Sequence, residues 1–370
     1  MDKTNTPKVC IISTVNLMHM TLSSLYTNYF QKNDIPYDII YIDKYGIDEF
    51  TDAANIYKYR VKNRKSKVLK IFNVLRFVSF AKKLIYKNDY DLLIVWNELT
   101  AVLMSNFLAK KYKNKYVINI RDYGFNDLPI IKKRTQKVIE ASSFTMISSN
   151  RFMEFLPKID KYLFVHSYNE EIFKNIDFKY RKKDKNQIIT ILFIGKMSYF
   201  KEAINFIEKL GNDNRFKLKF VGAGTELLEP YIMKNKIKNI ELIGKFSPNE
   251  TAKYLIEADI IYNLYGFGAK DVDTLLSIKL YYAIYLNMPI LIYDNTHTNT
   301  YAKNAGINIT IPNKKIINLA DIIYEKYQTW DEKKAKEKSA AIMKEIKDSH
   351  NMLYNKLGEL LKKDNMKNIH

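Results

Sequence analysis

A glycine followed by two lysines marks the first candidate site in this sequence of 370 residues. The apolar run Ile188–Ile194 has the character of a buried parallel strand and ends at Gly195. Lys196 and Lys201 follow, and Glu202–Leu210 is predicted to be a helix. A glycine lets a ligand approach the backbone closely, and a helix start offers unpaired N–H groups and a positive dipole. Two lysines beside such a turn suit a pyrophosphate.

The same order of strand, glycine and helix recurs further along the chain. The strand Lys217–Val221 ends in Gly222-Ala-Gly224, and the strand Ile240–Ile243 ends in Gly244-Lys245-Phe246. Each short motif is weak evidence by itself, because glycines also serve ordinary turns. The series as a whole predicts the carboxyl edge of a doubly wound sheet, where nucleotides bind.

Glu98 is a candidate catalytic residue in the first half of the chain. It follows the apolar run Leu92–Trp96, so it lies at the same kind of strand end. The alternative is a structural role, because a carboxylate is favoured at a helix start. No set of His, Cys and acidic residues has the spacing of metal ligands, and we expect neither a metal nor another cofactor.

Strand-like apolar runs alternate with helical stretches along most of the chain. The predicted strands of the first half are Val9–Ser13, Tyr37–Ile42, Leu92–Trp96, Tyr116–Ile120, Phe144–Ile147 and Tyr162–Val165. The predicted helices there are Leu22–Lys32, Ser66–Lys87, Leu99–Lys111 and Ile131–Ala141. The predicted strands of the second half are Ile188–Ile194, Leu218–Val221, Ile240–Ile243, Ile260–Leu264, Ile290–Tyr293 and Ile307–Ile311. This alternation predicts an α/β fold with parallel sheets covered on both faces.

A polar and charged segment divides the alternating pattern into two halves. We therefore predict an N-terminal Rossmann-like domain over residues 1–168 and a linker over 169–187. A second Rossmann-like domain is expected over residues 188–345. Residues 346–370 are expected to form a helix that packs back towards the first domain.

Basic residues dominate the charge of the chain. Lysine and arginine number 60 against 40 acidic residues, which gives a formal net charge of +20. Such an excess favours a polyanionic partner, such as phosphorylated substrates or an anionic membrane. A solvated, lysine-rich surface is the alternative. The basic residues are scattered and no recognition module appears, so we expect no nucleic-acid partner.

The single cysteine and the short apolar runs bear on the compartment. Cys10 excludes an internal disulfide and fits a reducing environment. No run reaches the roughly 20 apolar residues of a membrane span. Val9–Thr14 is too short for the core of a signal peptide. We expect a cytoplasmic protein, with peripheral attachment to the inner face of the plasma membrane as a further expectation.

The motifs of the second half resemble those of the family-4-like retaining glycosyltransferases, especially the branch that builds bacterial capsular and other surface polysaccharides. Gly195–Lys201 resembles the family motif whose two cations hold the donor diphosphate. Gly222–Gly224 resembles its strand-end glycines, and Gly244–Phe246 resembles the turn that contacts the nucleobase. The resemblance implies the GT-B fold, in which the active site lies in the cleft between two Rossmann-like domains.

Further residues receive a role through this resemblance. The segment Ser277–Ile290 resembles the Lys-Leu-Tyr-Glu/Asp…Pro segment of the surface-polysaccharide branch. It implies that Ser277, Lys279 and Tyr282 join Lys245 and Phe246 in binding the donor. Asn119–Tyr123 resembles a strand-end His/Arg-Asp pair, which adds Arg121 to Glu98, Lys196 and Lys201 as a candidate catalytic residue.

The sequence departs from the family pattern at the Glu-x7-Glu pair. Counting back from Pro289 places these positions at Thr274 and Tyr282, and neither residue is a carboxylate. A tyrosine hydroxyl accepts hydrogen bonds from a ribose more weakly than a glutamate does. Asp271 and Asp273 lie close enough to replace the first glutamate. Arg121 stands where many relatives carry a histidine, and arginine cannot act as a base at neutral pH.

The segment Arg64–Lys87 combines an apolar stripe with many cations. The stripe consists of Val68, Phe72, Leu75 and Val78, and the surrounding charges are Lys65, Lys70, Arg76, Lys82 and Lys83. A basic amphipathic helix is typical of a membrane-surface segment. It is equally what a helix that covers a sheet looks like in a basic protein.

The resemblance implies a metal-independent transferase that moves a sugar from a nucleotide-sugar to a growing surface glycan or a lipid-linked acceptor. It also implies that the anomeric configuration is retained. Two alternatives remain open. The replaced glutamates allow a catalytically weak, transferase-like partner subunit, and the GT-B fold is shared by nucleotide-sugar 2-epimerases.

Overall fold

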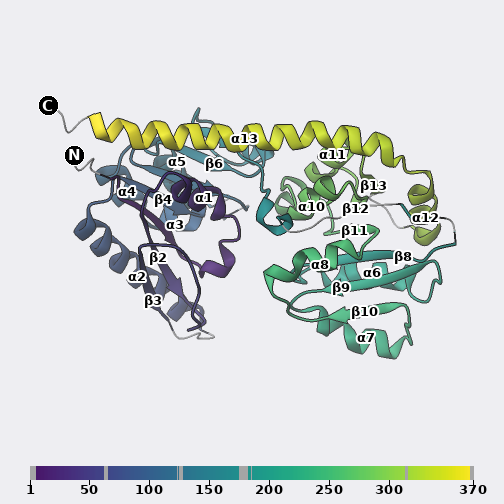
Figure 1. Cartoon of the computed structure of the whole chain (residues 1–370). Coiled ribbons are helices and arrows are strands. Elements are labelled where there is room, and N and C mark those ends of the chain that lie inside the picture. Colours follow the sequence, from purple (N-terminus) through teal and green to yellow (C-terminus); the bar gives the residue numbers. More distant parts are fainter. Residues whose placement is uncertain are drawn as a thin grey trace. The chain divides into compact units, whose positions relative to one another are not determined.

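The computed structural model describes residues 6–61, 66–122, 124, 128–174, 182–184, 186–312 and 316–366. The chain forms two compact units (Figure 1). Unit 1 combines Met1–His166 with Asp348–His370, and unit 2 comprises Ser167–Lys347. Each unit is built on one parallel β-sheet. Much of the predicted linker, residues 175–181 and 185, lies outside the described residues.

The sheet of unit 1 has seven strands in the order β3-β2-β1-β4-β5-β6-β7. Their bounds are β1 Val9–Ser13, β2 Tyr37–Asp43, β3 Asn55–Arg60, β4 Leu92–Trp96, β5 Tyr116–Ile120, β6 Phe144–Ile147 and β7 Tyr162–Phe164. The helices are α1 Ser24–Lys32, α2 Lys67–Asn88, α3 Glu98–Leu103, α4 Ser105–Lys111 and α5 Pro129–Glu140, with short 3-10 turns at Leu17–His19 and Asn150–Glu154. The strands β1, β4 and β5 are buried along their whole length, which explains their continuous apolar runs.

Two features of unit 1 differ from the sequence-based prediction. The edge strand β3 was not predicted, because its polar and aromatic residues are all at least partly exposed and form no apolar run. Its pairing with β2, such as Tyr57 opposite Ile40, comes from the tertiary structure. The predicted helix Leu99–Lys111 is interrupted at Met104, which separates α3 from α4.

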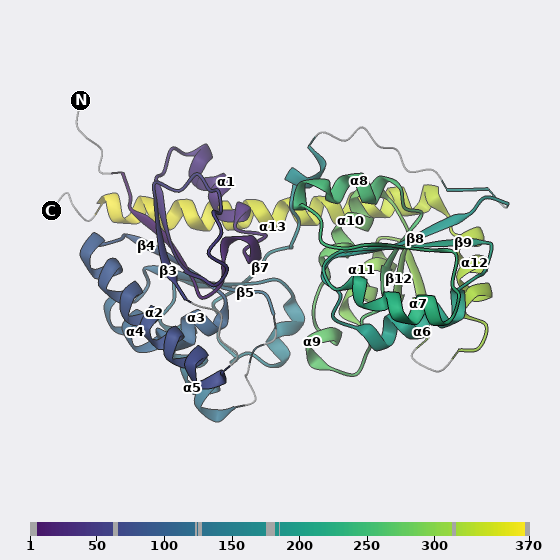
Figure 2. The same ribbon diagram turned by 90° about the horizontal axis from the view of Figure 1, so that it is seen from below.

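The sheet of unit 2 has six strands in the order β10-β9-β8-β11-β12-β13. The bounds are β8 Ile189–Ile194, β9 Phe216–Val221, β10 Ile240–Ile243, β11 Ile260–Asn263, β12 Ile290–Tyr293 and β13 Asn308–Ile311, so every strand predicted here is confirmed. The helices are α6 Phe200–Leu210, α7 Glu229–Lys234, α8 Thr251–Ile256, α9 Lys270–Asp273, α10 Ile278–Leu286, α11 His297–Asn304 and α12 Leu319–Thr329, with 3-10 turns at Glu170–Phe173, Thr225–Leu228 and Pro248–Glu250. Figure 2 shows this sheet nearly edge-on, with α6 on one face and α8 on the other.

The last helix, α13 Glu332–Met366, contributes residues to both units. In unit 1, Leu353, Leu357 and Leu361 belong to the same buried apolar cluster as the strands β1 and β2. A ring nitrogen of His350 lies 3.0 Å from the carbonyl oxygen of His166, which fixes the helix to the end of β7. This part of the chain therefore completes a core formed mainly by much earlier residues.

The helix α2 covers the sheet with only part of its length. Phe77, Ala81 and Ile85, from the middle of the helix onwards, are fully buried. Nearer the start of the helix, five large apolar side chains are exposed, namely Val68 at 74%, Leu69 at 37%, Ile71 at 62%, Phe72 at 49% and Leu75 at 52%. The predicted stripe is thus divided, because Val78 packs on the sheet while its other three members face solvent.

Two further predictions concern this region and the membrane. Arg64 and Lys65, at the start of the predicted basic segment, lie outside the described residues. Across the described ranges, no helix is both long enough and apolar enough to cross a membrane.

Candidate functional site

The order of strands in unit 2 places a switch point between β8 and β11. These two strands are neighbours, and the chain continues from β8 to β9 on one side and from β11 to β12 on the other. Ligands of open α/β sheets bind outside the carboxyl ends of the strands at such a point. The residues that follow β8 and β11 are therefore the first to consider.

Gly195 and Gly222, predicted from separate motifs, meet directly at this edge. The amide of Gly195 donates to the carbonyl oxygen of Val221 over 2.9 Å. A Cβ atom built on Gly222 would lie 1.8 Å from the carbonyl oxygen of Gly195, and Gly222 has φ +138°. Only glycine satisfies both conditions, because a side chain would collide with backbone and adopt a strained conformation. Gly224 follows with φ +92°, next to the backbone of Met197.

The third predicted turn joins the other two. The amide of Gly222 donates to the carbonyl oxygen of Ile243 over 2.8 Å, which brings the Gly244 turn beside the Gly222 turn. Lys245 is exposed there, and the ring of Phe246 lies edge-on to Tyr254 at 5.5 Å. All three glycine turns therefore lie along one edge of the sheet.

Glu226 also belongs to this edge and was not predicted. Its Oε2 accepts a hydrogen bond of 2.9 Å from the amide of Gly224 and lies near Gly244. The signal in the sequence was weak, since an acidic residue just after a glycine at a helix start is also an ordinary capping residue.

Lys279 is the most unusual side chain at the switch point. Only 3% of it is exposed, and its ammonium donates to the hydroxyl of Tyr265. The Nζ lies 4.9 Å from the ring centroid of Phe193 and 4.6 Å from that of Tyr265. It is also 3.7 Å from the position that a Cβ would take on Gly195.

The ammonium of Lys279 forms no ion pair with a carboxylate within the described part of the chain. A buried charge is costly unless another charge or several hydrogen bonds compensate it. Two aromatic faces and one hydroxyl compensate this cation only in part. The arrangement therefore favours an anion next to Gly195.

Ser277 holds the start of α10 in place and thereby positions Lys279. Its hydroxyl caps α10 by accepting from the amide of Lys279 over 3.3 Å, and it donates to Oδ1 of Asn263 over 2.7 Å. The amide of Ser277 donates to Oγ1 of Thr298 over 3.1 Å. These bonds fix the start of α10 against the end of β11.

Tyr282 occupies the predicted position of the second glutamate and is almost completely buried. Its ring packs edge-on against Phe173 with centroids 6.0 Å apart, and burial raises the pKa of its hydroxyl.

At the position of the first glutamate, Thr274 donates to the carbonyl oxygen of Lys270 over 2.6 Å. Asp273 accepts from the amide of Gly268 at 3.1 and 3.0 Å, so this carboxylate is bound by its own loop.

Lys196 and Lys201 are both solvent-accessible. Lys196 follows Gly195 directly, and Lys201 lies in the first turn of α6, which begins at Phe200. Neither lysine has an ion-pair partner among the described residues. Their side chains are therefore available to a ligand at the edge where Gly195 and Lys279 meet.

In unit 1, Glu98 is the first residue of α3 and is mostly buried. Its Oε1 accepts a hydrogen bond of 2.7 Å from the hydroxyl of Thr135. A Cβ built on Gly124 would lie 2.3 Å from Oε2 of Glu98. The carboxylate thus links the start of α3 to α5.

Arg121 follows β5 at the carboxyl edge of the same sheet and is half-buried. Burial raises the pKa of Tyr26, and the nearby guanidinium of Arg121 opposes that rise. Two residues earlier, Asn119 is fully buried, and neither polar atom of its side chain has a hydrogen-bond partner in the described chain. The sequence motif contains Asn119 but assigns it no role, and Tyr123 of that motif lies outside the described residues.

The described ranges contain no ready metal site. No group of three or more His, Cys, Asp or Glu side chains within them is arranged to hold a metal ion. Apart from the carboxylate of Glu226, the polar groups described at this edge are ammonium, amide and hydroxyl donors.

Several solved structures share this architecture. The sucrose-phosphate synthase of Thermosynechococcus elongatus aligns with a TM-score of 0.72 and 11% identity over 95% of this chain and 99% of that chain. The chain has the GT-B fold. A glycosyltransferase of Rickettsia africae gives a TM-score of 0.69 with 15% identity over 98% of this chain and 100% of that one. HepE of Anabaena in complex with UDP-glucose gives 0.65 with 9% identity over 95% and 99%.

No protein-family model matches the sequence, and no curated protein matches it. The identities with the solved structures are low, so these likenesses concern the fold. The fold class predicted from the motifs is confirmed. The roles of the individual residues remain predictions.

Proposed function

We propose that this protein is a glycosyltransferase that takes a sugar from a nucleotide-sugar donor. The observation that carries the proposal is the buried ammonium of Lys279, which has no carboxylate partner in the described chain and lies beside Gly195 at the switch point. A donor diphosphate is the anion that suits such a site. HepE, which shares the fold, was solved in complex with UDP-glucose, and this supports the same class of donor.

The proposal assigns each residue of the edge a distinct role. Lys279, Lys196 and Lys201 contact the diphosphate, and the backbone at Gly195, Gly222 and Gly224 allows its close approach. Lys245 and Phe246 lie at the turn that faces the nucleobase, Ser277 positions Lys279, and the hydroxyl of Tyr282 binds the ribose.

The three lysines stabilise the charge that develops on the departing diphosphate. The bond between the anomeric carbon and the diphosphate oxygen breaks while a bond to the acceptor oxygen forms. An oxygen of the leaving phosphate takes the proton of the acceptor hydroxyl, so no protein base is required. Attack on the same face retains the anomeric configuration, and we propose that no metal takes part.

Glu98 and Arg121 belong to unit 1, which we propose holds the acceptor. Arg121 is suited to bind a hydroxyl or phosphate oxygen of the acceptor and not to remove a proton. Glu98 accepts a hydrogen bond from Thr135 of α5, and we propose that it acts by positioning.

We further propose a surface glycan or a lipid-linked molecule as the acceptor, reached at the inner face of the plasma membrane. The exposed apolar half of α2 supports this, because five neighbouring large side chains of that half face solvent. Lys70 and Arg76 lie among them, and the guanidinium of Arg76 is 4.4 Å from the ring centroid of Phe72. Exposed apolar residues mixed with cations suit an anionic membrane surface.

The experiment that tests the donor site measures thermal unfolding with UDP, GDP, ADP and UDP-glucose. A ligand at 100 times its Kd stabilises the folded state by about 2.7 kcal/mol, which gives a measurable rise in Tm. We expect at least one nucleotide to raise the Tm. If no nucleotide raises the Tm, the proposal is wrong.

Exchanging Lys196 or Lys201 for alanine should slow turnover by about one to two orders of magnitude.

A transferase-like partner subunit is the second candidate. It is favoured by the burial of Tyr282 against Phe173, where a ribose-binding carboxylate was expected. A protein of this class would bind no nucleotide diphosphate in a calorimetric titration. A 2-epimerase would convert the nucleotide-sugar without any acceptor, which NMR of the donor alone would reveal.

A further inference from the structure

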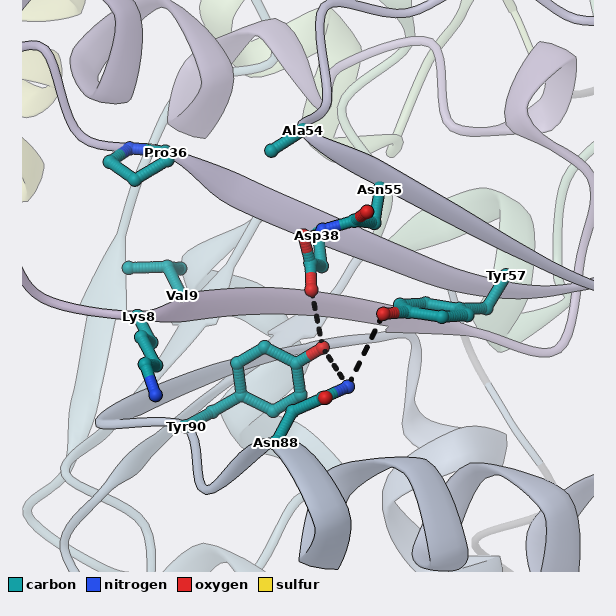
Figure 3. Close-up of a pocket in the computed structure, with 9 residues that line it drawn as sticks. All are labelled: Lys8, Val9, Pro36, Asp38, Ala54, Asn55, Tyr57, Asn88 and Tyr90. Carbon is teal, nitrogen blue, oxygen red and sulfur yellow. Dashed lines mark hydrogen bonds between the residues drawn. The ribbon is translucent and has the colours of Figure 1, made fainter.

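A pocket lies in unit 1, at the opposite edge of the sheet from Glu98 and Arg121. It has a volume of about 270 Å³ and is found where β1, β2 and β3 begin (Figure 3). The lining residues are Lys8, Val9, Pro36, Asp38, Ala54, Asn55, Tyr57, Asn88 and Tyr90. None of them belongs to the proposed donor site.

The polar wall of this pocket is organised around the buried carboxylate of Asp38. Its Oδ2 accepts a hydrogen bond of 2.6 Å from the hydroxyl of Tyr90, and its Oδ1 accepts one of 2.9 Å from the side-chain amide of Asn55. The amide of Asn88 donates to the hydroxyl oxygens of Tyr90 and Tyr57 at 3.0 and 3.4 Å. Figure 3 shows these groups converging on one side of the pocket.

This network leaves particular hydrogen-bonding groups for a ligand. The oxygen of Tyr57 accepts from Asn88, so the hydroxyl proton of Tyr57 has no acceptor within the described chain. The side-chain carbonyl oxygens of Asn55 and Asn88 likewise accept no hydrogen bond there. The pocket thus offers one hydroxyl donor and two amide acceptors, held in place by a carboxylate that is itself satisfied.

The composition of the wall excludes several classes of ligand. Both oxygens of Asp38 are engaged by neutral donors, and no metal-binding cluster occurs in the described residues. Lys8 is the only cation among the lining residues, which is too few for a diphosphate. The volume is below the roughly 300–1,000 Å³ of most small-molecule pockets, so a whole nucleotide-sugar does not fit.

The opposite side of the pocket is mainly apolar. Val9 and Pro36 lie there across from Tyr57, with the side chain of Lys8 beside Val9, as Figure 3 shows. A pyranose ring has this same division, with hydroxyl groups at its rim and C–H groups on its faces. Tyrosine rings with amide groups beside them are well suited to both features.

We propose that this pocket binds one neutral sugar unit, as a glycan-binding site separate from the donor site. That the sugar belongs to the growing glycan rests on the proposed function, whereas the binding of a sugar rests on the pocket alone. Such a site would hold a glycan chain on unit 1 between successive transfers.

The test is saturation-transfer NMR of the full chain with methyl α-D-glucopyranoside, methyl α-D-galactopyranoside and N-acetylglucosamine. We expect at least one sugar to bind, and the double change Tyr57→Ala with Asn88→Ala to weaken its binding at least fivefold. The matched control is Tyr86→Ala, an exposed tyrosine on α2 outside the pocket, which should leave binding unchanged. If the double variant fails to fold, Asn55→Ala at the exposed rim takes its place and should also weaken binding.

Competition with UDP separates this proposal from the donor site. We expect UDP not to displace the sugar, and Lys279→Met to leave the sugar signal intact. The inference is overturned if no sugar binds, if UDP displaces the bound sugar, or if the pocket variants bind it as well as the unchanged protein does. Failure of UDP to bind would instead contradict the donor site while leaving a pocket-dependent sugar signal in place.

Discussion

At the scale of single residues, burial distinguishes Lys279 from the other lysines of the edge. Lys196 and Lys201 are solvent-accessible, as most lysines are. Lysines in such surroundings are common on the surfaces of basic proteins. Lys279 is buried against Phe193 and Tyr265 and held by the cap at Ser277. A buried cation is costly unless an anion compensates it, so Lys279 is the best residue with which to test the proposed function.

We expect Lys279→Met to weaken UDP binding by about 10- to 100-fold, because a charge-assisted hydrogen bond contributes roughly 1.5–3 kcal/mol. The Tm without ligand should not fall, since the change removes a buried charge and keeps an unbranched apolar chain. Calorimetric titration and thermal unfolding measure the two effects. Lys326→Met, on the helix α12 away from the edge, is the control and should alter neither. Unchanged UDP affinity in Lys279→Met would contradict the assignment.

A second prediction concerns the contact between Gly222 and Gly195. We expect Gly222→Ala to lower the Tm strongly and to abolish UDP binding, because the new Cβ would overlap the carbonyl oxygen of Gly195. Gly268→Ala is a matched control, since Gly268 also has positive φ but a Cβ built there would have nothing within 4 Å. Backbone strain alone should cost the control about 1–2 kcal/mol. Equal losses of stability in both variants would show that the close contact is unimportant.

At the scale of elements, the two ends of α2 differ in burial. From its middle onwards, the helix contributes Phe77, Ala81 and Ile85 to the packing on the sheet, as any covering helix does. Its first half leaves a group of large apolar side chains exposed. Exposed groups of large apolar side chains are typical of interaction surfaces, and this is the basis of the proposed membrane contact.

We expect the chain to sediment with phosphatidylserine vesicles at low salt and to be released at high salt, because screening shortens the Debye length from ~10 Å at 0.1 M to ~3 Å at 1 M. The combined change Val68→Ser, Ile71→Ser and Phe72→Ser should abolish this binding and leave the Tm and UDP affinity unchanged, since all three side chains are exposed. Tyr86→Ser, exposed at the other end of α2, is the control. A chain that ignores the vesicles even at low salt would argue for a soluble acceptor.

At the scale of the whole molecule, each unit has its own sheet and core, yet the core of unit 1 is completed by the last helix. Leu353, Leu357 and Leu361 are buried among residues from the first half of the sequence. Unit 1 thus requires residues on both sides of unit 2 in the chain, so it cannot become fully stable until α13 is present.

We expect Leu357→Ala to destabilise unit 1 by about 2–5 kcal/mol, because it removes a fully buried side chain and leaves a cavity. A nucleotide bound to unit 2 should raise the unfolding temperature of that unit by mass action. Calorimetry of Leu357→Ala with UDP should therefore separate an early transition from a later, ligand-dependent one. Met352→Ala, exposed on the same helix, is the control. A single transition that shifts as a whole would show that the two units unfold together.

The sequence by itself determined the class of fold and the position of the glycine turns. Buried parallel strands such as Ile189–Ile194 need continuous apolar runs, and a tight turn at their ends needs glycine. Both features can therefore be recognised from a short stretch of sequence. The strand β3 escaped this reasoning because it is exposed at a sheet edge and is defined by its pairing with β2.

Only the tertiary structure decided which of the predicted groups share a site. Lys196, Lys201 and Lys279 are the same residue type in the sequence. The burial of Lys279 depends on Phe193 of β8 and on Tyr265, which follows β11. The exposure of one half of α2 likewise depends on where the sheet ends and not on the helical pattern. The burial of a lysine, unlike that of a continuous apolar strand, depends on contacts between distant segments, and no local pattern of residues encodes it.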